Sequence, residues 1–196
     1  MKSLLKKYYE GINSVAVIGN YLPRQCGIAT FTTDLISALT SEAPEINNWS
    51  VVMNDQPEGY IYPDKVRFEI NQNILSEYSV AAQFMNISQA DIVSVQHEFG
   101  IFGGVAGSHL LKLLGELRMP IVTTLHTVLK DPKPDYRKVM LRLVDLSDKL
   151  IVMSHKAFDI LQAVYGVPKE NIVFIHHGIP YLPFVDPHFY KEKFAV

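Results

Sequence analysis

Short, mainly apolar runs recur along this chain and alternate with longer amphipathic stretches. Each run is only a few residues long and is rich in valine, isoleucine and leucine. Continuous apolar character over so short a length is typical of strands that are buried on both faces of a sheet. The pattern predicts seven strands, over residues 15–18, 51–53, 66–70, 92–95, 121–125, 150–153 and 172–175.

The stretches between most of these runs carry apolar residues at the three- and four-residue spacing of a helix. Pro134 stands at a first-turn position, and Gly166 followed by Pro168 is typical of a helix end. Strands that alternate with helices predict a parallel, doubly wound sheet with helices on both faces, which is a Rossmann-like α/β fold of about seven strands. The helical spacing covers residues 28–39, 74–85, 106–117, 139–144 and 158–164.

The sequence changes character at Gly178, because three prolines follow within the next ten residues. A segment so rich in proline suits neither a helix nor a strand. We therefore expect residues 1–177 to form one Rossmann-like domain and residues 178–196 to be a linker.

Composition and charge narrow the classes of function. The 196 residues carry a formal net charge of −2 at pH 7, and the basic residues are scattered along the sequence. They do not form the basic cluster that is typical of nucleic-acid-binding proteins, so this class is excluded. The single cysteine, Cys26, excludes an internal disulfide, and the basic start of the chain lacks the apolar core of a signal peptide. We expect a cytoplasmic protein. Residues 1–9 mix basic and apolar side chains, and a segment that short makes at most a weak contact with a membrane surface.

Polar residues and glycines follow the fourth predicted strand, in the segment QHEFGIFGG at residues 96–104. Open parallel sheets bind ligands beyond the carboxyl ends of their strands. His97 and Glu98 are titratable there, and Gly103 and Gly104 let backbone N–H groups approach an anion. The segment is a candidate binding site. The alternative is a turn on its glycines, in which His97 and Glu98 only cap the following helix and face water.

Three other strand ends also carry unusual residues. Gly27 is the first residue of a predicted helix and would expose N–H groups to a phosphate or sugar hydroxyl. The alternative is that this glycine only allows the backbone to turn into the helix. No dinucleotide-binding or P-loop motif accompanies it. His126 follows the fifth strand and suits a general base or a partner of a sugar hydroxyl, unless it is a core-edge histidine satisfied by carbonyls. His176 and His177 point to opposite faces of an extended segment, so a turn is favoured over a metal pair.

Four segments taken together resemble the N-terminal domain of family 4 glycosyltransferases of the group 1 type. They are PRQCGIATF at 23–31, QHEFGIFGG at 96–104, TLHTVL at 124–129 and HHGIP at 176–180, and their order and spacing agree along nearly the whole chain. The resemblance implies the GT-B architecture, in which two Rossmann-like domains face each other across a cleft. It also implies a retaining transfer of a sugar from a nucleotide-sugar donor to a carbohydrate or lipid-linked acceptor, with no metal ion or other cofactor.

The resemblance assigns roles to individual residues. Gly27 matches the glycine that approaches the donor phosphate and the acceptor, and His126 matches the histidine that contacts the transferred sugar. His97, Glu98 and the glycine pair at 103–104 match a loop on the acceptor side. We therefore predict His126 as the catalytic residue. The predicted substrate-binding residues are Arg24, Gln25, Gly27, Ile28, His97, Glu98, Phe99, Gly103, Gly104 and Thr127.

In such enzymes a second domain that holds the nucleotide follows the linker, and this sequence stops before one. We expect the 196 residues to be the acceptor-side half, inactive in transfer alone, with an exposed cleft face that favours self-association. Two alternatives stay open. One is an epimerase-like enzyme for nucleotide-sugars, or a nicotinamide enzyme, on the same architecture. The other is a free-standing carbohydrate-binding or interaction module.

Overall fold

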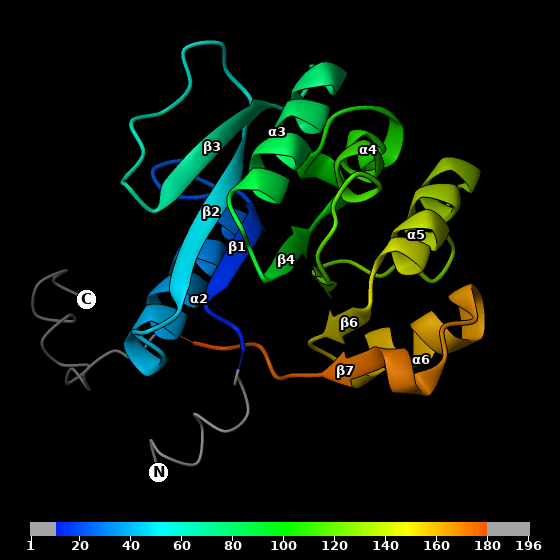
Figure 1. Cartoon of the computed structure of the whole chain (residues 1–196). Helices are drawn as coiled ribbons and strands as arrows, with labels where there is room; N and C mark the ends of the chain where they lie inside the picture. The colour runs from blue at the N-terminus through cyan, green and yellow to red at the C-terminus, as the bar shows by residue number, and fades with distance from the viewer. Residues whose placement is uncertain (1–10, 180–196) are drawn as a thin grey trace, which may run out of the picture.

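A single parallel sheet lies between two layers of helices in the computed structural model, which describes residues 11–179 (Figure 1). The strand order is β3-β2-β1-β4-β5-β6-β7, and every neighbouring pair is parallel. This confirms the predicted Rossmann-like, doubly wound α/β fold. The strands are β1 (Ser14–Gly19), β2 (Asn47–Asn54), β3 (Val66–Asn71), β4 (Ile92–His97), β5 (Ile121–Leu125), β6 (Lys149–Val152) and β7 (Ile172–Phe174).

The helices divide between the two faces of the sheet because alternate strand residues point to opposite sides. Val17 and Val52 pack on one side with Ile36 of α2, whereas Ile18 and Val51 belong to a larger cluster with α3, α4, α5 and α6 on the other. Figure 1 shows α2 behind the sheet and α3, α4 and α5 in front of it. The helices are α2 (Gly27–Glu42), α3 (Leu75–Ile87), α4 (His109–Leu114), α5 (Pro134–Leu146) and α6 (His155–Tyr165).

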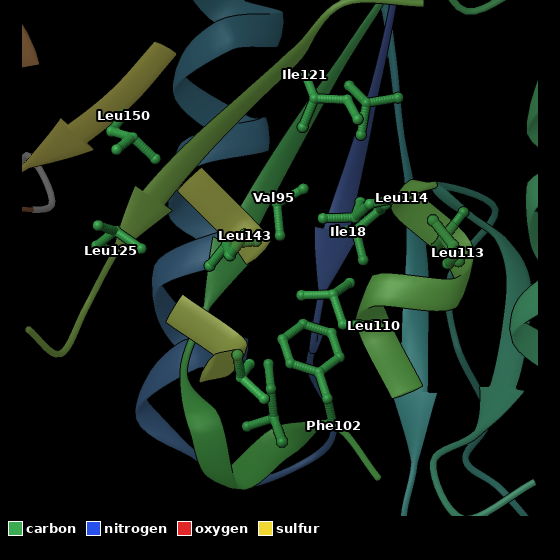
Figure 2. Packing of buried hydrophobic residues seen from close by; sticks show 14 of the residues in the cluster. Ile18, Val95, Phe102, Leu110, Leu113, Leu114, Ile121, Leu125, Leu143 and Leu150 are labelled. Atoms are coloured by element: carbon green, nitrogen blue, oxygen red, sulfur yellow. The ribbon is translucent and has the colours of Figure 1, made fainter. Parts of the chain in front are cut away.

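The larger cluster also takes in the loop that follows β4. Phe102 comes from this loop and is 4% exposed, and Figure 2 shows its ring beside Leu110 of α4 and near Ile18 of β1. Burial of a phenylalanine side chain contributes about 1.5–3 kcal/mol. The loop that carries the candidate site is therefore anchored by the core itself.

The predicted helix over residues 106–117 is wrong in its length. The structure has three short elements after β4, namely the 3₁₀ turns η1 (Phe99–Ile101) and η2 (Val105–Gly107) and the six-residue α4. Gly104 and Gly107 have φ values of +79° and +76°, and Ala106 lies between them at +53°. This left-handed backbone is incompatible with a continuing α-helix, so the regular turns begin only at His109.

Other signals at helix ends are confirmed. Pro134 is the first residue of α5, and Gly166 caps α6 in the left-handed conformation with a φ of +70°. Beyond β7, residues 175–179 run back across the sheet toward α2, where the ring of His177 lies 5.2 Å from that of Phe31 (Figure 1). The predicted linker from residue 180 onward and the basic segment at 1–9 lie outside the described residues. Within residues 11–179, no helix is both long and apolar enough to cross a membrane.

Candidate functional site

The carboxyl ends of β1, β4 and β5 lie next to one another, and each is followed by a segment that the sequence singles out. The strand order reverses between β1 and β4, which is the place where doubly wound sheets bind ligands. His97 pairs with Leu125 in the register of β4 and β5, and the backbone N–H of His126 donates to the carbonyl of His97 at 3.1 Å. The two histidines at the carboxyl ends of β4 and β5 are thus direct neighbours.

His126 is held by contacts from β4 and α2. Its Nε2 lies 3.1 Å from Oε1 of Gln96, and its ring meets the edge of Phe31 of α2 at a centroid distance of 4.6 Å. Burial, with a smaller contribution from the nearby His177, lowers the pKa of His126 to about 4. The imidazole is therefore neutral at pH 7, so it can accept a hydrogen bond or a proton but carries no positive charge.

A cavity of about 470 Å³ opens beside His126, between the ends of β5 and β6. Ser154, Lys156 and His177 contribute polar atoms to its wall, and the rest is mainly apolar. This volume lies within the usual range for small-molecule sites. A larger groove of about 660 Å³ lies between η2 and α5, but none of the predicted site residues lines it. Of the predicted site residues, His126 alone lines the cavity of about 470 Å³.

Glu98 ties the loops after β4 and β5 together. Its Oε1 accepts a hydrogen bond from the N–H of Phe99 at 2.9 Å, and its Oε2 accepts one from the hydroxyl of Thr127 at 2.5 Å. Hydrogen bonds to an ionised acceptor are the stronger kind. The alternative in which Glu98 caps the following turn is therefore correct for one carboxylate oxygen, while the other oxygen fixes Thr127 beside His126.

His97 lies beneath this surface and does not face water. Its side chain is 0% exposed, and its ring contacts Phe99 and Phe102 at centroid distances of 4.8 and 6.0 Å. Neither ring nitrogen has a hydrogen-bond partner among residues 11–179. Burial, aided by the neighbouring His126, lowers the pKa of His97 to about 3. The alternative of a water-facing His97 is wrong, and in this conformation the ring supports the loop without lining the cavity.

Gly27 occupies the position that the sequence predicts, as the first residue of α2. The Sγ of Cys26 accepts a hydrogen bond from the N–H of Ala29 and so caps the helix. Gly27 is exposed, and a Cβ placed on it would meet no atom within 4 Å. Since Phe31 lies one turn further along α2 and touches His126, the start of α2 borders the same surface.

Arg24 turns inward, whereas its neighbour Gln25 is exposed. The guanidinium of Arg24 donates to the carbonyl of Met53 at 2.7 Å and pairs with Asp55 at 3.1 Å. Its side chain thereby joins the loop after β1 to the end of β2. Ile28 is half-buried and packs against the larger core cluster. Within this segment, Gln25 and Gly27 are open to a ligand, while Arg24 and Ile28 shape the loop.

The glycine pair at 103–104 has a packing role. A Cβ on Gly103 would stand 1.7 Å from the carbonyl oxygen of Gln72, a distance at which atoms overlap. The hydroxyl of Tyr78 accepts from the N–H of Gly103 at 3.0 Å and donates to the same carbonyl at 2.9 Å. Burial raises the pKa of Tyr78 to about 12, so this hydroxyl keeps its proton. The pair therefore docks the loop onto the end of β3, and the proposed role in approaching an anion stays a prediction.

The two histidines after β7 are separated as their spacing predicts. The ring of His176 contacts Phe174 at 4.7 Å, and that of His177 contacts Phe31 at 5.2 Å. No group of three or more histidine, cysteine, aspartate or glutamate side chains in the described part of the chain is arranged to hold a metal ion.

Two contributors to the site are missing from the sequence prediction. Gln96 belongs to a segment that the sequence singles out, yet only the structure shows it bound to His126, and it is fully buried. Phe31 looks like one more apolar position of a helix. The one available signal for Gln96 was a polar side chain near the end of an otherwise apolar strand, because a buried polar group needs a hydrogen-bond partner.

A family model matches residues 27–181 of the sequence, and it is that of Glycosyltransferase Family 4. The chain belongs to this family. The match spans most of the sequence and includes Gly27, His97, Glu98 and His126. The predicted identity of the domain, as the N-terminal domain of a family 4 glycosyltransferase, is thereby confirmed.

Solved structures of glycosyltransferases share the fold of this family 4 domain. The apo form of the lipopolysaccharide outer core galactosyltransferase WaaB superposes with a TM-score of 0.59 at 14% identity, over 85% of this chain and 46% of that one. A glycosyltransferase from Rickettsia africae ESF-5 gives a TM-score of 0.55 at 14% identity, over 86% of this chain and 44% of that one. No curated protein sequence matches. This chain spans less than half the length of these two glycosyltransferases.

Proposed function

We propose that the protein carrying this domain transfers a sugar from a nucleotide-sugar donor to a hydroxyl group of a carbohydrate or lipid-linked acceptor. The reaction proceeds with retention at the anomeric carbon and without a metal ion. Membership of family 4 supports the reaction class. The observation that carries the proposal is the neutral His126, which Gln96 of β4 and Phe31 of α2 contact and which lines a cavity between the ends of β5 and β6.

The residues around the cavity suit a sugar hydroxyl better than a charged group. A neutral imidazole exchanges single hydrogen bonds with hydroxyls, and Ser154 in the same wall offers the same kind of partner. Gly27 leaves the start of α2 open, so a donor phosphate can approach its N–H groups. We assign contact with the transferred sugar to His126 and placement of the acceptor to the loop that Glu98 anchors.

The nucleotide is held, in this proposal, by a second domain that faces the strand ends. The two glycosyltransferases that share the fold are more than twice as long as the segment that this chain matches in them. Binding energy for the nucleotide then comes from the second domain, so these 196 residues alone bind sugars weakly and do not turn over. Release of a nucleoside diphosphate from UDP-glucose or GDP-mannose by the purified chain would contradict this division of labour.

Weak sugar binding is measured by saturation-transfer NMR with glucose, galactose, mannose and N-acetylglucosamine at high millimolar concentration. We expect signal transfer to at least one sugar, and we expect His126→Ala to abolish it. Arg142→Ala is the control because Arg142 is an exposed residue of α5 that lines the other groove and not this cavity. Equal loss in both variants, or no transfer to any sugar or nucleotide-sugar, would refute the proposal.

A further inference from the structure

Gln96 is a fully buried polar residue near the end of β4, and its amide makes one hydrogen bond with each of its ends. Its Nε2 donates to Oγ of Ser94 at 3.1 Å, and its Oε1 lies 3.1 Å from Nε2 of His126. Ser94 and Gln96 are two residues apart on one strand, so they share a face of the sheet. The amide therefore bridges the interior of β4 and the histidine at the end of β5.

The direction of this bridge fixes where the proton of His126 lies. The amide of Gln96 is oriented with Nε2 toward Ser94 and with its carbonyl oxygen Oε1, which can only accept, toward the imidazole. The Nε2 of His126 must then carry the hydrogen. A neutral imidazole has only one such hydrogen, which leaves Nδ1 with a free lone pair.

Nδ1 of His126 is the ring nitrogen that stays available. It has no hydrogen-bond partner among residues 11–179, and, unlike both ring nitrogens of His97, it is not among the buried polar atoms without a partner. His126 also lines the cavity of about 470 Å³. The ring therefore donates a hydrogen bond from Nε2 to Gln96 and leaves Nδ1 as a free hydrogen-bond acceptor.

We propose that Gln96 is a positioning residue that holds His126 in the Nε2–H tautomer, so that Nδ1 meets the substrate as an acceptor and selects a group that donates a hydrogen bond. The identification of that group as a sugar hydroxyl rests on the proposed function, whereas the tautomer does not. Phosphate and carboxylate oxygens have no hydrogen to give and are disfavoured at this point.

The other groups around His126 do not compete for its proton. The ionisable side chains that face it are His97 from β4 and His177 from the segment after β7, and Lys156 of α6 lines the same cavity. None of these three is a carboxylate, which would favour the doubly protonated ring. Phe31 holds the ring plane through an edge contact and offers no hydrogen-bond partner.

The tautomer is read directly from long-range ¹H–¹⁵N NMR spectra of the imidazole nitrogens in the ¹⁵N-labelled 196-residue chain at pH 7. We expect a protonated Nε2 and an unprotonated Nδ1 for His126. His109 is an internal reference of the opposite kind, because its Nδ1 lies 3.3 Å from the carbonyl oxygen of Gln72 and must carry the hydrogen there.

Two substitutions separate positioning from packing. Gln96→Met keeps the volume but removes the acceptor, so the preference for the Nε2–H form should fall about fivefold, which is the factor that one net hydrogen bond contributes. Gln96→Glu keeps an acceptor and adds a charge, so the Nε2–H form should persist and the pKa of His126 should rise. The signals of His109 should be unchanged in both variants. If Gln96→Met does not fold, Gln96→Glu still decides, because a pKa of His126 equal to that in the wild type would show that the side chain at position 96 does not act on the ring.

A protonated Nδ1 on His126 in the wild-type chain would overturn the inference and leave the proposed function standing. An unchanged tautomer ratio in folded Gln96→Met would also overturn it. Titration with the four monosaccharides tests the second half, because a bound hydroxyl should shift the Nδ1 resonance of His126 and leave that of His109 in place. If sugars saturate the chain elsewhere without moving Nδ1, the hydroxyl selection by His126 is refuted.

Discussion

Arg24 provides a sharp test, because its position in a predicted binding loop and its contacts in the structure assign it different roles. The side chain is 8% exposed, and it donates to the carbonyl of Met53 at 2.7 Å and pairs with Asp55 at 3.1 Å. Arg24→Met keeps most of the aliphatic length and removes the guanidinium. We expect this change to destabilise the fold rather than to act only on a ligand.

The magnitude follows from the two shorter contacts, since the third contact of the guanidinium, to Oδ1 of Asn20, is longer at 3.3 Å. The carbonyl of Met53 is left without its charged donor, and a hydrogen bond to a charged group contributes about 1.5–3 kcal/mol. The carboxylate of Asp55 has a side chain that is 38% exposed, so it turns to water and its pairing adds at most about 1 kcal/mol. The free energy of unfolding should therefore fall by about 2–4 kcal/mol.

Urea denaturation followed by circular dichroism measures this change. With a slope of about 3 kcal/mol per molar urea, the midpoint should fall by about 1 M. Asp55→Asn should lower stability by less than about 1 kcal/mol, and Gln25→Ala, at the exposed neighbour, by less than about 0.5 kcal/mol. A midpoint for Arg24→Met equal to that of Gln25→Ala would refute the assignment of Arg24 to the scaffold.

Three further predictions concern the glycines, the buried histidine and the tie between the loops. Gly103→Ala forces a Cβ to 1.7 Å from the carbonyl oxygen of Gln72 and should destabilise the chain by more than about 2 kcal/mol in the same urea assay, whereas Gly27→Ala, with open space around it, should change stability by less than about 1 kcal/mol; equal effects would contradict the loop geometry. Burial lowers the pKa of His97 from 6.5 to about 3, so the unfolded chain binds this proton first, and the free energy of unfolding should fall by up to about 1.4 kcal/mol for each pH unit between 6.5 and about 3; His97→Leu should remove that share of the slope, and an unchanged slope would contradict the burial of a neutral His97. Thr127→Val removes the hydroxyl that donates to the carboxylate of Glu98 and should lower the free energy of unfolding by about 1–3 kcal/mol at pH 7. Amide hydrogen exchange should become faster in the loops after β4 and β5, and unaltered exchange would show that this hydrogen bond does not hold the two loops together.

The sheet could be predicted from the sequence because parallel strands are buried on both faces and read as continuous apolar runs. The helix after β4 could not be placed correctly, since the apolar spacing from residue 106 to 117 persists through backbone that Gly104 and Gly107 hold in the left-handed region. Hydrophobic periodicity reports which side chains are apolar, but it does not report the backbone dihedral angles.

The candidate site could be located from the sequence, but the orientation of its side chains could not. His97 ends β4 and His126 directly follows β5. Contacts with Phe99 and Phe102 make His97 a buried support, whereas His126 lines the cavity. Arg24 turns inward because its guanidinium donates a hydrogen bond to the carbonyl of Met53 on β2. Such pairings join segments far apart in the chain, and one sequence does not record them.

The central claim is that the strand ends around His126 form the sugar-binding surface of this family 4 domain. It is tested most directly by backbone ¹H–¹⁵N NMR of the 196-residue chain, titrated with the four monosaccharides and with UDP-glucose and GDP-mannose. We predict that saturable shifts gather at Gly27, Thr127 and the start of α6. Shifts that gather instead along the groove between η2 and α5, around Val105 and Arg142, would contradict the claim.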